Sequence, residues 1–226
     1  MRTHPPRRRS VHPVREGKQS RVRFVQYAAE IKDWLRSSPT VEAARPPCCP
    51  CCGAASSPPG ASLRIHGHGV RTRQVRGPLS PEGSPEIIVL TLRRYRCQRC
   101  RAVITVGPPG LMPGWLYSAQ AIGWALALYG LAKRSAADVR RRVSPWPKVG
   151  NAAFGSWATL RRWIKAVRSG RLFAQVRPCP AAWTLRQIAE RAATTLAAQA
   201  LPLGSAVPLD HHAWHGAAQL GRAIAM

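Results

Sequence analysis

Two pairs of cysteines restrict the folds open to this chain more than any other feature. One pair lies within Cys49-Pro50-Cys51-Cys52-Gly53 and the other within Cys97-Gln98-Arg99-Cys100. Two C-x2-C pairs supply four thiolates for a tetrahedral zinc site, and the tight turn of each pair points backbone N–H groups at the sulfur atoms. Because four thiolates leave no position open for water, we expect a structural Zn²⁺ ion held by Cys49, Cys52, Cys97 and Cys100.

The register of the first pair has a second interpretation, because Cys48 and Cys51 also stand at C-x2-C spacing. We prefer Cys49 with Cys52, since Gly53 then follows the second ligand, where a positive φ is often needed. Under this preference the other two cysteines are spare or substitute ligands.

Other uses of the cysteines are less favoured. Their odd total of seven, their clustering and the lack of an export signal favour metal binding over a disulfide framework. A redox pair is expected near a βαβ pattern, which the sequence lacks. His66 and His68 lie between the pairs and could compete as ligands, but exposure to solvent is the simpler interpretation.

Three segments around the cysteines have the apolar and β-branched composition of strands: residues 63–75, 86–95 and 102–106. The Pro- and Gly-rich linker 77–85 would join the first two as a long hairpin. This hairpin would bring the cysteine pairs together across the 44 residues between them at a modest cost in loop entropy. The sequence therefore predicts a zinc ribbon over residues 44–107.

Two different patterns precede the ribbon. Residues 1–20 carry six cations against one acid and three prolines, which predicts a disordered basic arm. Over residues 21–38, apolar side chains recur at steps of three and four, which predicts an amphipathic helix with one face formed by Phe24, Tyr27, Ile31 and Trp34.

The composition becomes helical after the Pro- and Gly-rich break at residues 108–114. Helices ending near residues 131, 143 and 168 are expected to have the N-caps Ser118, Ser135 and Ser156. We assign residues 115–172 to a helix-turn-helix-like domain and residues 173–226 to an Ala/Pro-rich tail with one helix over 184–201. The predicted fold class is α+β, with a disordered basic N-terminus, a small zinc-ribbon β module and an all-α domain.

The charge balance limits the classes of partner. The 226 residues include 35 Lys+Arg and 9 Asp+Glu, which gives a formal net charge of +26 and a pI of about 11.6. This favours a polyanionic partner, double-stranded DNA first. No segment approaches the roughly 20 apolar residues of a membrane span, and the basic start lacks the apolar stretch of a secretory signal. We therefore expect a cytoplasmic protein with no membrane partner.

The helix expected over residues 156–168 separates apolar from basic side chains. Its apolar side consists of Trp157, Leu160, Ile164 and Val167, and its opposite side of Arg161, Arg162, Lys165 and Arg168. A helix of this kind can pack on one face and present four cations to a major groove. The preceding helix is expected to add phosphate contacts through Arg140, Arg141 and Arg142. The link over residues 144–155 is longer than the turn of a tight helix-turn-helix.

A second basic surface is expected on the zinc module, from Arg71, Arg73, Arg76, Arg93, Arg94, Arg96, Arg99 and Arg101. The aromatic residues are not spaced as a stacking platform. Binding of single-stranded RNA is therefore the less favoured variant.

These motifs together resemble the zinc-ribbon plus helix-turn-helix proteins of bacterial insertion elements, a transposase-related and largely uncharacterised family. The resemblance rests on the cysteine pairs, on His66-Gly67, on the run Arg94–Cys100 and on Trp157–Trp163, and it covers about residues 44–172. It implies zinc binding through the four cysteines, DNA binding through the Trp157–Arg168 helix and a transposase partner. Arg101 departs from the pattern, because such ribbons usually have Gly after the last cysteine.

We do not expect an enzyme. Strand transfer by a complete transposase needs three carboxylates on a sheet to hold two metal ions, and the acids after the zinc module are limited to Asp138, Glu190 and Asp210. The sequence therefore favours a DNA-binding targeting module of an insertion element. An RNA- or ribosome-associated zinc ribbon and a DNA-binding transcriptional regulator remain as alternatives.

Overall fold

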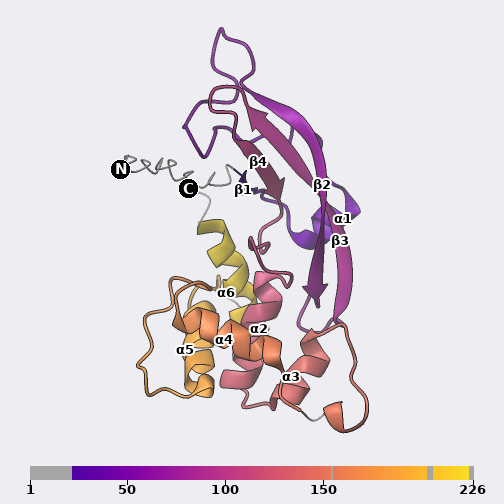
Figure 1. Cartoon of the computed structure of the whole chain (residues 1–226), viewed down its shortest axis with the longest axis vertical. Coiled ribbons are helices and arrows are strands. Elements are labelled where there is room, and N and C mark those ends of the chain that lie inside the picture. The colour runs from indigo at the N-terminus through magenta and orange to yellow at the C-terminus, as the bar shows by residue number, and fades with distance from the viewer. Residues whose placement is uncertain (1–21, 154, 203–205, 224–226) are drawn as a thin grey trace, which may run out of the picture.

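The computed structural model of the chain describes residues 22–153, 155–202 and 206–223. It has an α+β architecture with a four-stranded mixed sheet and six helices. Figure 1 shows the sheet at one end of an elongated molecule and helices α2 to α6 at the other. The basic arm expected over residues 1–20 lies outside the described residues.

The sheet has the strand order β1-β4-β3-β2. Its strands are β1 (Val22–Gln26), β2 (Ile65–Gly77), β3 (Glu86–Cys97) and β4 (Val103–Gly107). Strands β2, β3 and β4 pair antiparallel, while β1 pairs parallel to β4. The three strands predicted from the sequence and the long hairpin loop between β2 and β3 are confirmed.

The predicted helix over residues 21–38 is wrong in its first half. Val22–Gln26 forms β1, and only Ile31–Arg36 is helical, as α1. Without β1, the outer edge of β4 would expose its unpaired N–H and C=O groups. This pairing joins residues that are 81 positions apart, such as Val22 and Val103, so a local periodicity of apolar residues cannot reveal it.

The segment that follows β1 covers one face of the sheet and is fastened to β3 by side-chain hydrogen bonds. The indole Nε1 of Trp34 donates to the carbonyl of Thr91 at 3.0 Å, and the Tyr95 hydroxyl donates to the carbonyl of Val41 at 2.7 Å. Trp34 and Tyr95 are also buried in the core of the sheet module. The N-terminal segment is therefore part of the module and not a separate element.

The helical end of the molecule begins after the expected break. Its helices are α2 (Ala119–Gly130), α3 (Ala136–Val143), α4 (Ala158–Arg168), α5 (Leu185–Ala197) and α6 (Leu209–Ala223), with a 3-10 turn at Gly150–Ala153. The hydroxyls of Ser118 and Ser135 accept hydrogen bonds from N–H groups of the first turns of α2 and α3, as predicted. Within the described part of the chain, no helix has the length and apolar character that a membrane span requires.

Helix α4 does not begin as predicted. Ser156 was expected to cap it, but Trp157 occupies the N-cap position and makes no capping hydrogen bond. The Trp157 ring instead packs edge to face against Tyr117 and Trp163, with centroids 6.1 and 5.0 Å away. Burial of this large ring sets the start of the helix in place of a polar cap.

The expectation of a tail over residues 173–226 is also wrong, because helix α6 in this segment completes the helical core. Helix α6 packs against α2 and α5, and Ala213, Trp214 and Ala217 are buried in the same core as α2 and α4. The indole Nε1 of Trp124 in α2 donates to the Asp210 carboxylate at 2.9 Å. The small residues that made this segment look unable to form a core allow its helix to approach the others closely.

Two glycines permit this close helix packing. A Cβ on Gly130 of α2 would overlap the backbone of Ala189 and Glu190 in α5, and a Cβ on Gly216 of α6 would overlap the Leu196 carbonyl oxygen. Neither contact leaves a flexible side chain that could move away. The α2–α5 and α5–α6 contacts therefore depend on the absence of a side chain at these positions.

We expect Gly130→Ala to lower the free energy of unfolding by about 1–3 kcal/mol, because the added methyl group forces two helices apart. Denaturant unfolding of the full chain measures this change. The control is Gly83→Ala in the hairpin loop, where the nearest atom to a new Cβ is the Ser80 hydroxyl at 3.2 Å. Equal effects of the two substitutions would contradict the close-packing explanation.

Candidate metal centre and basic surfaces

The four preferred cysteines meet at one point at the end of the sheet. All four sulfur atoms lie within 4.8 Å of one another, with Sγ–Sγ distances of 3.6 Å for Cys49–Cys100 and 3.8 Å for Cys52–Cys97. Zinc–sulfur bonds of about 2.3 Å in a tetrahedron require sulfur–sulfur distances of about 3.8 Å. The group can therefore hold a metal ion.

The structure brings together the cysteines of the preferred register of the first pair. Cys48 and Cys51 are exposed and lie outside the group, whereas Cys49 is buried and Cys52 is half-buried. His66 and His68 are exposed and do not join the sulfur atoms, as the simpler interpretation predicted. The His66 ring contacts the carbonyl of Leu63 instead, at 2.8 Å.

The two cysteine loops have the same backbone structure. In the first, the N–H of Gly53 donates to the carbonyl of Cys49 at 2.9 Å. In the second, the N–H of Arg101 donates to the carbonyl of Cys97, also at 2.9 Å. The residue after each pair has a left-handed backbone, with φ of 66° at Gly53 and 63° at Arg101.

The next residue of each loop is a buried alanine whose carbonyl returns to the first ligand. The N–H of Cys49 donates to Ala54 at 2.9 Å, and that of Cys97 donates to Ala102 at 3.0 Å. Backbone hydrogen bonds alone thus close each pair into a short turn. The departure at Arg101 leaves this geometry intact, although a side chain then occupies a conformation that favours glycine.

Burial opposes ionisation of three of the four thiols. Burial raises the pKa of Cys49, and burial raises the pKa of Cys100 to about 12. Burial opposes ionisation of Cys97 too, but the backbone N–H groups of Cys100 and Arg99 and the adjacent thiols outweigh it and lower the pKa of Cys97 to about 7. A divalent ion would stabilise the thiolate form of its cysteine ligands. Metal binding would therefore release protons, and the affinity for metal would fall as the pH falls.

The metal centre lies far from the helical end. Cys97 is the last residue of β3, and the other end of the β2–β3 hairpin contacts α2, where Gly77 packs on Ala121. A rise of about 3.3 Å per residue makes the 12-residue strand about 36 Å long. A metal ion here would stabilise the tip of the sheet without contacting α4.

Helix α4 has the two faces expected from the sequence. Trp157, just before it, and Leu160, Ile164 and Val167 within it are buried. Arg161, Arg162 and Lys165 are exposed. Arg168 is exposed as well, but its guanidinium donates to the carbonyls of Trp183 and Ala181 and so fastens the segment after α4. Three of the four expected cations are therefore exposed to solvent and make no hydrogen bond of this kind to the backbone within the described residues.

The three arginines of α3 differ in accessibility. Arg140, an expected phosphate contact, is only 4% exposed and donates to the Ala153 carbonyl at 2.8 Å, which corrects that expectation. Arg141 and Arg142 are exposed and surround the carboxylate of Asp138, at 2.9 and 3.8 Å. Exposed pairs of this kind are weak, so both guanidinium groups remain accessible to phosphate.

The acids of the helical end have structural contacts in different elements. Asp138 pairs with arginines of its own helix, Glu190 lies 2.5 Å from the Lys133 ammonium, and Asp210 accepts from Trp124. In the described ranges, the four cysteines are the one group of three or more His, Cys, Asp or Glu that could hold a metal ion.

Comparison of the sequence with protein-family models and with curated proteins, and of the structure with solved structures, finds no match. The resemblance to insertion-element proteins is thus an expectation that rests on the motifs alone.

Replacement of the ligand cysteines should separate the two registers. Cys49→Ser with Cys52→Ser should abolish the visible absorption of Co²⁺ in a four-thiolate site and destabilise the fold, because such sites couple binding to folding. Cys48→Ser with Cys51→Ser is the matched control and should retain one metal ion per chain. Loss of metal from the control would contradict the observed register.

Gly53→Ala and Arg101→Gly should have opposite effects on the metal-loaded protein. A left-handed alanine costs about 1 kcal/mol relative to glycine, so unfolding should become easier by about that amount in Gly53→Ala and harder in Arg101→Gly. Denaturant unfolding measures both.

Arg99→Ala controls for the lost charge, since Arg99 is exposed and adjacent, and it should change stability by less than about 0.5 kcal/mol. Destabilisation by both Gly53→Ala and Arg101→Gly would show that the two loops are not equivalent.

Proposed function

We propose that this chain is a zinc-stabilised DNA-binding protein that reads duplex DNA with α4. The observation that carries the proposal is the exposed cationic face of α4, formed by Arg161, Arg162 and Lys165, opposite a fully packed apolar face. A helix anchored on one side and basic on the other can enter a major groove while its scaffold stays rigid.

The charge distribution supports a polyanion as partner. Between Lys133 and Arg177 the sequence holds twelve cations and one acid, Asp138. A surface that only maintains solubility mixes both signs, whereas this region does not. Arg141 and Arg142 would contact phosphates beside α4, and Arg140 is excluded because it is buried.

Zinc is the proposed metal, in a structural role. The four thiolate ligands and their sulfur–sulfur distances suit a closed tetrahedral site. Bound zinc would hold the first cysteine loop against the end of β3 and would supply no open coordination position for chemistry.

The motifs that resemble insertion-element proteins favour a targeting role within such an element, with a separate transposase as partner. This role requires sequence preference at the ends of a mobile element. The docking geometry would differ from a tight helix-turn-helix, because residues 144–157 and a 3-10 turn separate α3 from α4.

Selection from a random duplex DNA pool with the zinc-loaded full chain tests the proposal. Arg161→Ala should relax the recovered motif, because a base contact carries about 1–3 kcal/mol of discrimination. Arg141→Ala should weaken all sequences alike and reduce the slope of log affinity against log salt by about one.

Arg36→Ala on α1 is the matched control, since it removes one exposed charge from the sheet end. Recovery of no motif by the wild-type protein, or equal loss of preference in the Arg161 and Arg141 variants, would reject α4 as the reading helix.

A further inference from the structure

Two adjoining pockets open between the sheet and the helical end. The first, which we name the aromatic pocket, has a volume of about 200 Å³ and is lined by Phe24, Gln26, Met112, Trp115, Phe173 and Gln175, among others. The second, the arginine groove, measures about 380 Å³ and includes Arg71, Arg73 and Thr105. Phe24, Pro113 and Trp115 line both, so the two spaces share a wall.

The sheet register explains why cations collect in the arginine groove. Arg71 opposes Leu92 and Arg73 opposes Leu90, so these arginines lie on the same face of the sheet as the two leucines. Arg94, which opposes Thr105 on β4, lies on this face as well. The covering segment on the opposite face contacts Arg93 instead, through the Pro39 carbonyl. This face of the hairpin is therefore basic over the part that runs from Arg73 to Arg94.

The positive charge in the groove is not neutralised. The Arg73 guanidinium donates to the carbonyls of Met112 and Trp115. Burial lowers the pKa of Arg73, and repulsion from Arg71 lowers it further. Arg71 is exposed and has no hydrogen bond or ion pair within the described residues. No acid is among the residues that line either pocket. The groove is therefore complementary to an anion.

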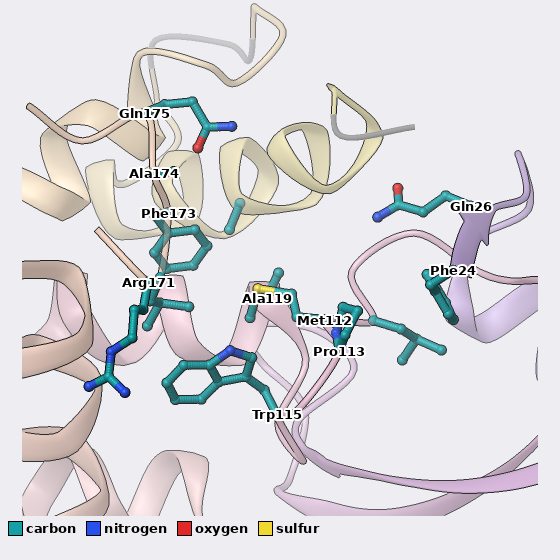
Figure 2. A pocket seen from close by; sticks show the side chains of 13 residues that line it. Phe24, Gln26, Met112, Pro113, Trp115, Ala119, Arg171, Phe173, Ala174 and Gln175 are labelled. Atoms are coloured by element: carbon teal, nitrogen blue, oxygen red, sulfur yellow. The ribbon is translucent and has the colours of Figure 1, made fainter. Parts of the chain in front are cut away.

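The aromatic pocket is suited to a flat ring with polar edges. Figure 2 shows Phe24 and Gln26 on one side, Arg171 and Phe173 on the other, and Trp115 with Met112 between them. The Gln26 side chain points toward this space, and its buried Oε1 has no hydrogen-bond partner within the described residues. A buried acceptor of this kind is complementary to an N–H donor on a ligand.

We propose that the two pockets bind one unpaired nucleotide of a nucleic-acid strand. The base lies in the aromatic pocket and its phosphates lie along Arg71 and Arg73. A volume of about 200 Å³ is below the 300–1,000 Å³ of a typical whole-ligand site, so it admits one base while the sugar and phosphate extend into the groove. Stacking on aromatic rings and contact with arginines are the two features of single-strand sites.

A strand is favoured over a free nucleotide because the basic face continues beyond the pockets. Arg94 and Arg96 follow Arg71 and Arg73 along the hairpin on the same face, toward the metal centre. The unpaired Gln26 oxygen further favours a base with an exocyclic amino group over thymine, whose one N–H donor lies between two carbonyl oxygens. The inference rests on the proposed function only for the class of ligand, since none of these residues belongs to α4.

Fluorescence anisotropy of labelled dA12, dT12 and a 12-base-pair duplex with the zinc-loaded full chain tests the proposal. Wild-type protein should bind dA12 about tenfold more tightly than dT12. Gln26→Leu should remove that difference. Arg71→Gln should weaken both single strands about fivefold and reduce the salt slope by about 0.7, the value for one phosphate of a single strand. In neither variant should duplex affinity change more than twofold.

Arg36→Gln is the matched control, because it removes one exposed charge from α1 on the opposite face of the sheet. A response of single-strand binding to Arg71→Gln no larger than to Arg36→Gln would overturn the proposal, as would equal wild-type affinity for dA12 and dT12. Competition by AMP as effective as by dA12 at equal nucleotide concentration would overturn the assignment to a strand.

A stacking signal gives an independent readout. An oligonucleotide with one 2-aminopurine should lose fluorescence on binding as that base stacks in the aromatic pocket, and Gln26→Leu should weaken this quenching. The duplex selection tests α4 separately from the pocket. Absence of a duplex motif with an intact preference for dA12 would reject α4 as the reading helix and leave the pocket proposal standing. A duplex motif without that single-strand preference would reject the pocket and leave α4 as the reading helix.

Discussion

The pairing of β2 with β3 is the constraint on which the rest of the molecule depends. The register places Ile65 opposite Cys97 at one end and Gly77 opposite Glu86 at the other. One end therefore brings the second cysteine pair back to the first, and the other end places the hairpin against α2. A closed metal site at the tip would oppose separation of these segments, because four ligands from two distant loops would have to dissociate together.

The sheet and the helices are held together by small, direct contacts. The N–H of Arg76 donates to the Leu116 carbonyl at 2.9 Å, and Gly77 leaves room for the Ala121 methyl group. From α6, His211 lies 3.5 Å from the Glu82 carboxylate of the hairpin loop. The segment that would have been a free tail thus contacts both the helices and the hairpin loop of the sheet, so its removal would affect more than the helical core.

The cationic surfaces differ in what their charges do within the fold. Arg73, Arg140 and Arg168 donate to backbone carbonyls and stabilise loops. Arg71 on the sheet and Arg161 on α4 are exposed. Net charge alone does not distinguish these groups, and a binding proposal has to include a member of the second, as Arg71 does beside Arg73 in the groove. The duplex and single-strand proposals use separate members of it, on separate elements.

Local sequence patterns predicted those features that neighbouring residues determine by themselves. The C-x2-C spacing indicated the ligands, Gly53 indicated the register, and Ser118 and Ser135 indicated helix starts, because each acts within a few residues of its own position. The apolar and basic faces of α4 also follow from a period of 3.6 residues.

Tertiary structure decided whatever depends on a distant partner. Val22–Gln26 is a strand because it pairs with the otherwise open edge of β4. Trp157 starts α4 because its ring packs on Tyr117. Helix α6 packs in the core because Gly130 and Gly216 let three helices approach closely. Arg140 is buried for the same kind of reason, and Phe24, Gln26 and Trp115 line a common pocket only after β1 and the segment before α2 are placed side by side. Such contacts depend on shape between segments far apart in the chain, which no local pattern of residues encodes.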